Sequence, residues 1–197
     1  MTEMNSISRF FVNLMSVRNS RRRFQWVSAH LRVPPRPTCL EIGCGNGDFA
    51  ARVLSGLGPQ RYLATDLDPR QIEVARRHLI RIYPQGLPAA LELRTADMLA
   101  LPFPDASFDA AFAFNVLHHA SAEHHDPTNL PRALEELHRV LRPGGNLTYA
   151  EFLHKERIRG WLSEREYTIA AARQRRRAEL VVAVKSAHNA ESIRATA

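Results

Sequence analysis

The fold is decided by the stretch Leu40-Glu41-Ile42-Gly43-Cys44-Gly45-Asn46-Gly47-Asp48, in which a hydrophobic strand runs into three alternating glycines. Glycines at such a turn let the backbone bend sharply and let a ligand approach the main chain. We therefore expect a strand over 38–42, a ligand-binding loop over 43–47 and a helix over about 48–55.

Strands and helices alternate along the rest of the chain. Further strands are expected at 62–66, 90–95, 109–114 and 147–151, with helices from about 69, around 130–141 and around 157–166. The segments 167–173 and 179–184 are expected to pair as a final hairpin. This alternation predicts an α/β fold, doubly wound, with a mostly parallel sheet and helices on both faces.

The charges in the glycine loop distinguish between the ligands that such loops bind. In the dinucleotide fingerprint Gly-x-Gly-x-x-Gly, the pyrophosphate lies at the helix N-terminus. Here the third glycine, Gly47, comes one residue early, and carboxylates stand at Glu41 and Asp48. This arrangement repels phosphate and suits a positively charged ligand, such as the sulfonium and ammonium groups of S-adenosylmethionine. A nicotinamide-dependent dehydrogenase is therefore disfavoured, and a P-loop is excluded because no Gly-Lys-Ser/Thr follows.

Acidic residues also follow the next two strands. Asp66 ends the strand 62–66, about 20 residues after the loop, where Rossmann-like folds use a carboxylate to bind ribose hydroxyls. Asp68 is the alternative, although it is also suited to cap the helix that begins at Pro69. Asp97, just past the strand 90–95, can accept a hydrogen bond from an adenine amino group.

Further motifs follow in a fixed order, namely Asp97-Met98, Leu101-Pro102-Phe103, Phe108-Asp109, Asn115-Val116-Leu117-His118-His119 and Leu141-Arg142-Pro143-Gly144-Gly145. Together with the loop and Asp66, they resemble the class I S-adenosylmethionine-dependent methyltransferase family, of the ubiquinone/menaquinone C-methyltransferase-like type. The resemblance covers roughly 38–152 and implies a Rossmann-like, seven-stranded sheet whose last strand is antiparallel. It is specific for fold and cofactor, but the same motifs serve many acceptors.

The resemblance implies S-adenosylmethionine as cofactor and S-adenosylhomocysteine as product. The loop 43–47 would contact the methionine part, Glu41 would order water or the ammonium group, and Asp66 would hold the ribose. Leu67 would flank the adenine, and the backbone near Asn115 would lie by the methionine end. With Asp97 and Met98 at the adenine edge, the implied cofactor-binding residues are Glu41, Gly43, Cys44, Gly45, Gly47, Asp66, Leu67, Asp97, Met98 and Asn115.

Methyl transfer from a sulfonium is a direct displacement with a good leaving group, so the protein mainly aligns the acceptor and excludes water. A general base is needed only if the acceptor must lose a proton early. His118 and His119 are the candidates for that role, since histidine transfers protons near neutral pH, and a structural role fits them equally. No metal is expected, because adjacent histidines converge poorly on one ion.

A small-molecule or lipid-like acceptor is the favoured substrate class. Methylation of nucleic-acid bases is disfavoured, because Asn115-Val116-Leu117-His118 stands where such enzymes carry Asn/Asp-Pro-Pro-aromatic. Two alternatives stay open. The chain could be an RNA or protein methyltransferase that docks through its basic N-terminal segment, or a non-catalytic cofactor-binding partner of a second subunit. The oligomeric state is not indicated by any pattern.

Composition places the chain among ordinary globular proteins, with 45% hydrophobic and 24% charged residues and a net charge of +7. No apolar run approaches the roughly 20 residues that span a bilayer, and no secretory signal pattern is present. The two cysteines form no disulfide framework, so a cytoplasmic setting is expected. We divide the chain into an N-terminal helical lid or appendage (1–33), a methyltransferase domain (38–185) and a flexible tail (186–197).

The N-terminal segment mixes aromatic and basic residues in a helical pattern before the prolines at 34–37. We expect Phe10, Phe11 or Leu14 to face the acceptor, and the run Arg21-Arg22-Arg23 to lie on the solvent side. The alternatives are that the segment packs against the sheet edge or is a flexible leader. The basic clusters can attract nucleic acid or anionic membrane, or can simply form a solvated face.

Overall fold

The sheet has the predicted seven strands, in the order β3-β2-β1-β4-β5-β7-β6. The computed structural model describes residues 20–122, 128–175 and 177–187. The strands are β1 (Thr38–Ile42), β2 (Arg61–Asp66), β3 (Leu91–Thr95), β4 (Phe108–Phe114), β5 (Leu141–Glu151), β6 (Thr168–Arg175) and β7 (Ala178–Val184). The helices are α2 (Asp48–Leu57), α3 (Pro69–Ile82), α4 (Leu117–Ala122), α5 (Asn129–Val140) and α6 (Lys155–Glu164), with a further helix over 20–30 that we call helix 20–30.

Strands β1 to β5 pair in parallel, and β7 runs antiparallel to both β5 and β6. The predicted doubly wound, Rossmann-like class with an antiparallel last strand is therefore confirmed. The strand order reverses between β1 and β4, because β2 and β3 extend the sheet on one side and β5 on the other. Open α/β sheets bind ligands beyond the carboxyl ends of the strands at such a switch point.

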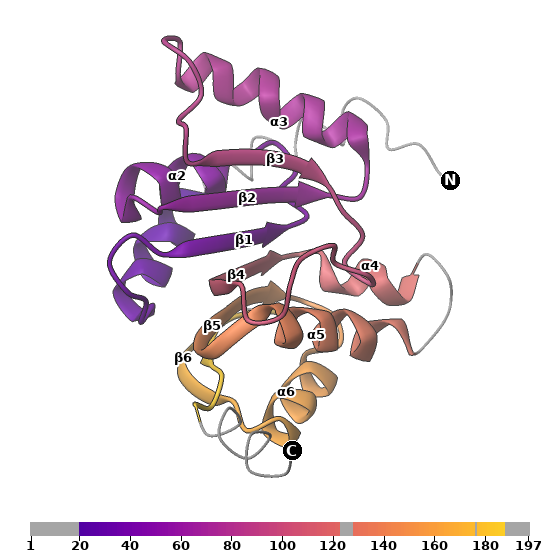
Figure 1. The fold of residues 1–197 in the computed structure, drawn as a ribbon. Helices are drawn as coiled ribbons and strands as arrows, with labels where there is room; N and C mark the ends of the chain where they lie inside the picture. The colour runs from indigo at the N-terminus through magenta and orange to yellow at the C-terminus, as the bar shows by residue number, and fades with distance from the viewer. Residues whose placement is uncertain (1–19, 123–127, 176, 188–197) are drawn as a thin grey trace.

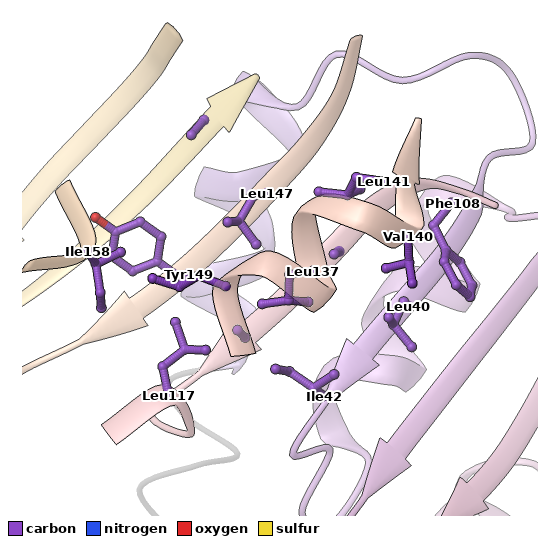
Figure 2. Packing of buried hydrophobic residues seen from close by; sticks show 14 of the residues in the cluster. Leu40, Ile42, Phe108, Leu117, Leu137, Val140, Leu141, Leu147, Tyr149 and Ile158 are labelled. Carbon is purple, nitrogen blue, oxygen red and sulfur yellow. The ribbon is translucent and has the colours of Figure 1, made fainter. Parts of the chain in front are cut away.

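Two apolar layers cover the sheet. Leu134 and Leu137 of α5 and Ile158 of α6 are buried against one face, as Figure 2 shows for residues such as Leu137 and Ile158. Phe49 of α2 and Ile72 of α3 are buried against the opposite face. Figure 1 shows α5 and α6 over the β4–β6 half of the sheet. This burial on both faces explains the continuous apolar run of β4, which is typical of parallel strands.

Strand β5 differs from its expected bounds. The sequence predicts a helix around 130–141 and a strand over 147–151. The helix ends at Val140 instead, and the extended chain begins at Leu141. Pairing with β4 shifts between Phe108 and Ala110, so that regular register resumes only at Asn146. The segment 142–144 is exposed and bulges out of the ladder, which proline tolerates at such a place.

Helix 20–30 packs on the same face of the sheet as α2. Val27 is buried in the core, and Phe24 lies so close to Gly56 that a Cβ on this glycine would come within 2.3 Å of the Phe24 ring. Beyond the helix, the Arg32 backbone N–H donates to Asn146 Oδ1 at 3.1 Å, and Asn146 Nδ2 donates to the Arg32 carbonyl at 2.6 Å. Helix 20–30 is therefore an integral part of the core.

The expected orientation of the arginine run is correct for two of its three residues. Arg21 and Arg22 are exposed, but Arg23 is half-buried and its guanidinium lies on the ring of Phe114, 4.5 Å from the ring centroid. The helical turn of about 100° per residue rotates Arg23 away from its neighbours and onto the sheet. Phe10, Phe11 and Leu14 lie outside the described residues, as do the tail residues 188–197.

Candidate functional site

The predicted cofactor residues gather at the carboxyl ends of four neighbouring strands. The glycine loop follows β1, Asp66 ends β2, Asp97 follows β3 and Asn115 follows β4. Because β1 to β4 are parallel neighbours in the sheet, these ends lie along one edge and span the switch point. The fold therefore brings together the residues that the motifs singled out.

The glycine loop presents its main chain at this edge. Gly43 and Gly45 have φ angles of +65° and +55°, in the left-handed region that glycine adopts without strain. A Cβ on Gly43 would come within 2.5 Å of a Val116 methyl group, so the loop packs directly against the β4 end. A Cβ on Gly45 would meet no heavy atom within 4 Å, so the backbone there faces open space. A ligand can therefore approach the main chain at Gly45.

Asp66 ties the end of β2 to the glycine loop. The Gly45 backbone N–H donates to Asp66 Oδ2 at 3.2 Å, and the Asp68 N–H donates to Oδ1 at 3.1 Å. Burial raises the pKa of this carboxyl above its usual range. Asp68 instead caps α3, because its side chain accepts from the Arg70 N–H at 2.8 Å and Pro69 begins the helix. Each carboxylate oxygen of Asp66 keeps accepting capacity for a hydroxyl group.

Glu41 is a buried carboxyl group beneath the loop. The Tyr62 hydroxyl donates to its Oε2 at 2.8 Å, and only 3% of the residue is exposed. Burial raises the pKa of Glu41 to about 8, and the positive charge of Arg23 acts in the opposite direction. An acid held in this environment gains from a nearby cation, because the cation compensates the cost of burying the charge.

Asp48 begins α2, at the position where a dinucleotide pyrophosphate would lie. Its two carboxylate oxygens are occupied, one by Asn46 Nδ2 at 3.0 Å and the other by His78 Nε2 at 2.9 Å. The residue is buried, so its negative charge stays close to the loop. This arrangement supports the expectation that the loop disfavours phosphate.

The adenine end of the candidate site is more open. Leu67 is 52% exposed although it follows a buried strand, so it offers an apolar surface at the sheet edge. Asp97 Oδ1 accepts from the Leu99 N–H at 2.8 Å, which orders the turn after β3. Met98 is partly buried and packs on the α5 side of the core. Leu67 thus follows the end of β2, and Asp97 and Met98 follow the end of the neighbouring strand β3.

Asn115 stands at the end of β4 with a φ of +53°, and its backbone N–H donates to the Ala150 carbonyl at 2.8 Å. Asparagine tolerates this left-handed conformation better than most residues. The residue is exposed, so the β4 end is accessible beside the loop. The turn directs the following residues, including His118, toward the end of β5.

His118 is hydrogen-bonded to Glu151, a residue that the sequence motifs did not single out. Glu151, at the end of β5, is fully buried, and its Oε2 lies 2.9 Å from His118 Nδ1. Its Oε1 accepts from the backbone N–H groups of Val116 and Leu117, both at 2.8 Å. A signal for Glu151 was present, because β1, β2 and β5 each end in or near an acidic residue.

The surroundings of His118 are aromatic. Its ring centroid lies 4.2 Å from that of His119 and 4.8 Å from that of Phe152. His119 and Phe152 are exposed, whereas the side chain of His118 is 12% exposed. In the part of the chain that the structure describes, no group of three or more histidine, cysteine or acidic residues is placed to hold a metal ion. The thiols of Cys39 and Cys44 are buried, and burial raises the pKa of both.

The comparison with protein families defines the class of this protein. The family model described as a methyltransferase domain matches residues 40–149, which include the glycine loop, Asp66, Asp97 and His118. The chain therefore belongs to the class I S-adenosylmethionine-dependent methyltransferase family. Membership of this family implies S-adenosylmethionine as the cosubstrate.

Individual relatives agree with this class. The chain is 36% identical over 116 residues to the 2-phytyl-1,4-naphtoquinone methyltransferase of Nostoc punctiforme, covering 58% of this chain and 46% of the relative. It is 34% identical over 114 residues to the 27-O-demethylrifamycin SV methyltransferase of Amycolatopsis mediterranei, covering 58% and 38%. The chain thus spans less than half the length of these two relatives. An S-adenosylmethionine-dependent methyltransferase from Aquifex aeolicus shares the fold, with a TM-score of 0.66 at 18% identity over 87% of this chain and 97% of that one.

Proposed function

We propose that this protein transfers a methyl group from S-adenosylmethionine to a small-molecule or lipid-like acceptor by direct displacement. The observation that carries the proposal is the open main chain at Gly45, placed between the carboxyl groups of Glu41, Asp48 and Asp66 at the switch point of the sheet. A site with this charge favours a cation and disfavours a phosphate.

The residues present fit the cofactor. In the proposed arrangement Glu41 receives the ammonium group, the backbone of the loop 43–47 lies along the methionine chain, and Asp66 accepts from the ribose hydroxyls. Leu67 and Met98 flank the adenine, and Asp97 accepts from its amino group. Together with Cys44 and Asn115, they are the cofactor-binding residues predicted from the sequence. When bound, the sulfonium supplies an electrophilic methyl group and leaves as a neutral thioether.

His118 is the candidate for proton transfer from the acceptor. Because the carboxylate of Glu151 only accepts, His118 Nδ1 carries the hydrogen of this bond, which leaves Nε2 as the nitrogen that can take a proton. Glu151 holds the ring in this orientation and is itself held by two backbone N–H groups. His119, which lies on the His118 ring and is exposed, is the second candidate. If neither histidine transfers a proton, the hydrogen bond between His118 and Glu151 serves only to fix the start of α4.

The proposed acceptor class rests on the apolar surface beside His118. Phe152 and Leu153 are 44% and 46% exposed, directly after the buried Glu151. Exposed large apolar residues at the edge of a candidate site favour an apolar ligand. The two relatives described above are named as methyltransferases of a naphthoquinone and of a rifamycin, both of them small molecules.

The proposal is tested with the purified chain and a labelled methyl donor. We expect calorimetry to detect binding of S-adenosylhomocysteine and no binding of NAD. Label should pass to members of a panel of quinols, phenols and polyketide-like alcohols, and not to tRNA or protein. Tight binding of NAD without binding of the sulfonium would overturn the assignment. Transfer of label to RNA or protein would show that the acceptor is a macromolecule. If the chain binds the cofactor but shows turnover only after a second subunit is added, a role as a cofactor-binding partner would be favoured.

A further inference from the structure

Helix 20–30 contributes a charged group to the candidate site, although it lies outside the residues 40–149 that define the family. The guanidinium of Arg23 stacks on Phe114, the last residue of β4 and the neighbour of Asn115 in sequence. Because β4 ends at the switch point, this contact places Arg23 at the methionine side of the predicted cofactor site.

The charges that act most strongly on Arg23 are those of Glu41 and Glu151. Within the described residues, however, Arg23 forms no ion pair with either carboxylate, because Glu41 is hydrogen-bonded to Tyr62 and Glu151 to His118. Burial lowers the pKa of Arg23, which reflects the cost of removing its charge from water. A half-buried guanidinium with five donors is stabilised where an anionic or accepting group meets it.

Other cations near this edge lack these properties. Arg21 and Arg22, on the same helix, are exposed to solvent. Arg159 of α6 is paired with Glu179 at 2.9 Å. Within the part of the chain that the structure describes, Arg23 is therefore the cation best placed to meet an anionic group of a ligand at the methionine end.

An amino-acid group carries an ammonium and a carboxylate on the same carbon atom. The site offers a matching pair of charges, with Glu41 below the loop and Arg23 on the ring of Phe114. We infer that Arg23 binds the α-carboxylate of the cofactor's methionine end while Glu41 receives the ammonium group. This inference rests on the proposed function, because it presupposes an adenosyl amino acid as the ligand.

The experiment compares three ligands by calorimetry on the full chain: S-adenosylhomocysteine, its decarboxylated amine analogue, and methylthioadenosine, which lacks the amino-acid carbon altogether. The native protein should bind S-adenosylhomocysteine about 10- to 100-fold more tightly than the decarboxylated analogue, since a hydrogen bond to a charged group has about this effect. Arg23→Gln should lose this preference, and its affinity for methylthioadenosine should stay within about twofold of native.

Arg22→Gln is the matched control, because it removes an exposed charge from the same helix and should retain the native preference. Arg23→Lys keeps a cation without the planar fork and should retain part of the preference. The inference is wrong if the native protein binds S-adenosylhomocysteine and its decarboxylated analogue equally, or if Arg23→Gln weakens binding of all three ligands by the same factor. Failure of the proposed function looks different, because then the native protein would bind none of the three.

Discussion

His118 and Glu151 are joined by a hydrogen bond of 2.9 Å between Nδ1 and Oε2, although 32 residues lie between them in the sequence. The end of β4 and the end of β5 are neighbours in the sheet, so the turn after β4 delivers the histidine directly to the carboxylate. A buried carboxylate that orients an imidazole suits a histidine that acts as a general base.

We predict that His118→Ala lowers turnover about 10²- to 10⁴-fold, the range for loss of a general base, on an acceptor that must lose a proton. Affinity for S-adenosylhomocysteine should change little, because the histidine lies beyond the loop. His119→Ala is the control, and should have a smaller effect if His118 alone takes the proton. An unchanged rate for His118→Ala, at every pH, would leave the pair with a structural role only.

Glu151→Gln tests positioning separately from proton transfer. The amide oxygen can still accept from one partner, but the charge that stabilises a protonated His118 is lost. We expect kcat to fall while the affinity for cofactor stays near native, because the neutral amide no longer compensates the positive charge that His118 gains when it takes the proton. A native kcat together with a lower free energy of unfolding would show that Glu151 acts through folding alone.

Asp66→Ala should weaken binding of S-adenosylhomocysteine by about 1.5 to 3 kcal/mol, the range for hydrogen bonds to a charged group. Asp68→Ala is the matched control. Because Asp68 caps α3, its replacement should lower the free energy of unfolding by about 1 kcal/mol without lowering the affinity for S-adenosylhomocysteine. Calorimetry and denaturant unfolding on both variants separate the two effects. Normal binding by Asp66→Ala together with impaired binding by Asp68→Ala would reverse the assignment.

Glu41 makes stability depend on pH. Burial raises the pKa of Glu41 to about 8 in the folded protein, whereas an unfolded glutamate titrates near about 4.3. The proton is therefore held more tightly in the folded state, and its contribution to stability is complete below about pH 4 and is lost as the pH rises through about 8. Glu41→Gln, which stays neutral, should be more stable than the native protein at about pH 9, and the gain should shrink toward about pH 5.

Denaturant unfolding at a series of pH values measures this difference. A constant offset between Glu41→Gln and native at every pH would mean that Glu41 is ionised in the folded protein throughout.

The same group should link proton release to binding, since a cationic ligand favours the charged carboxylate. Calorimetry near neutral pH, in two buffers of different ionisation heat, should detect protons released on binding to the native protein and fewer with Glu41→Gln.

Local patterns were sufficient for the sheet and for the cofactor loop. The alternation of strands and helices, the glycines at 43–47 and the acid at Asp66 are all encoded within short windows, so they could be predicted without tertiary contacts. Local patterns showed only that Glu151 ends a strand, and they gave the inward position of Arg23 no signal. The partners of Glu151 come from another strand end, and Arg23 stands in an arginine run whose composition favours solvent. Only the docking of helix 20–30 on the sheet turns that side chain inward.

That docking predicts that helix 20–30 supports the fold rather than acting as a separate lid. Val27 is 1% exposed, and Phe24 fills the space above Gly56. Val27→Ala should lower the free energy of unfolding by about 1 to 3 kcal/mol, through lost burial and a residual cavity. Ser28→Ala, at a less buried position of the same helix, is the control and should be nearly neutral.

Removal of residues 1–32 should therefore destabilise the whole domain and weaken cofactor binding. A truncated protein with native stability and native affinity would show instead that the helix is an appendage, and would remove the support for Arg23 as a cofactor ligand.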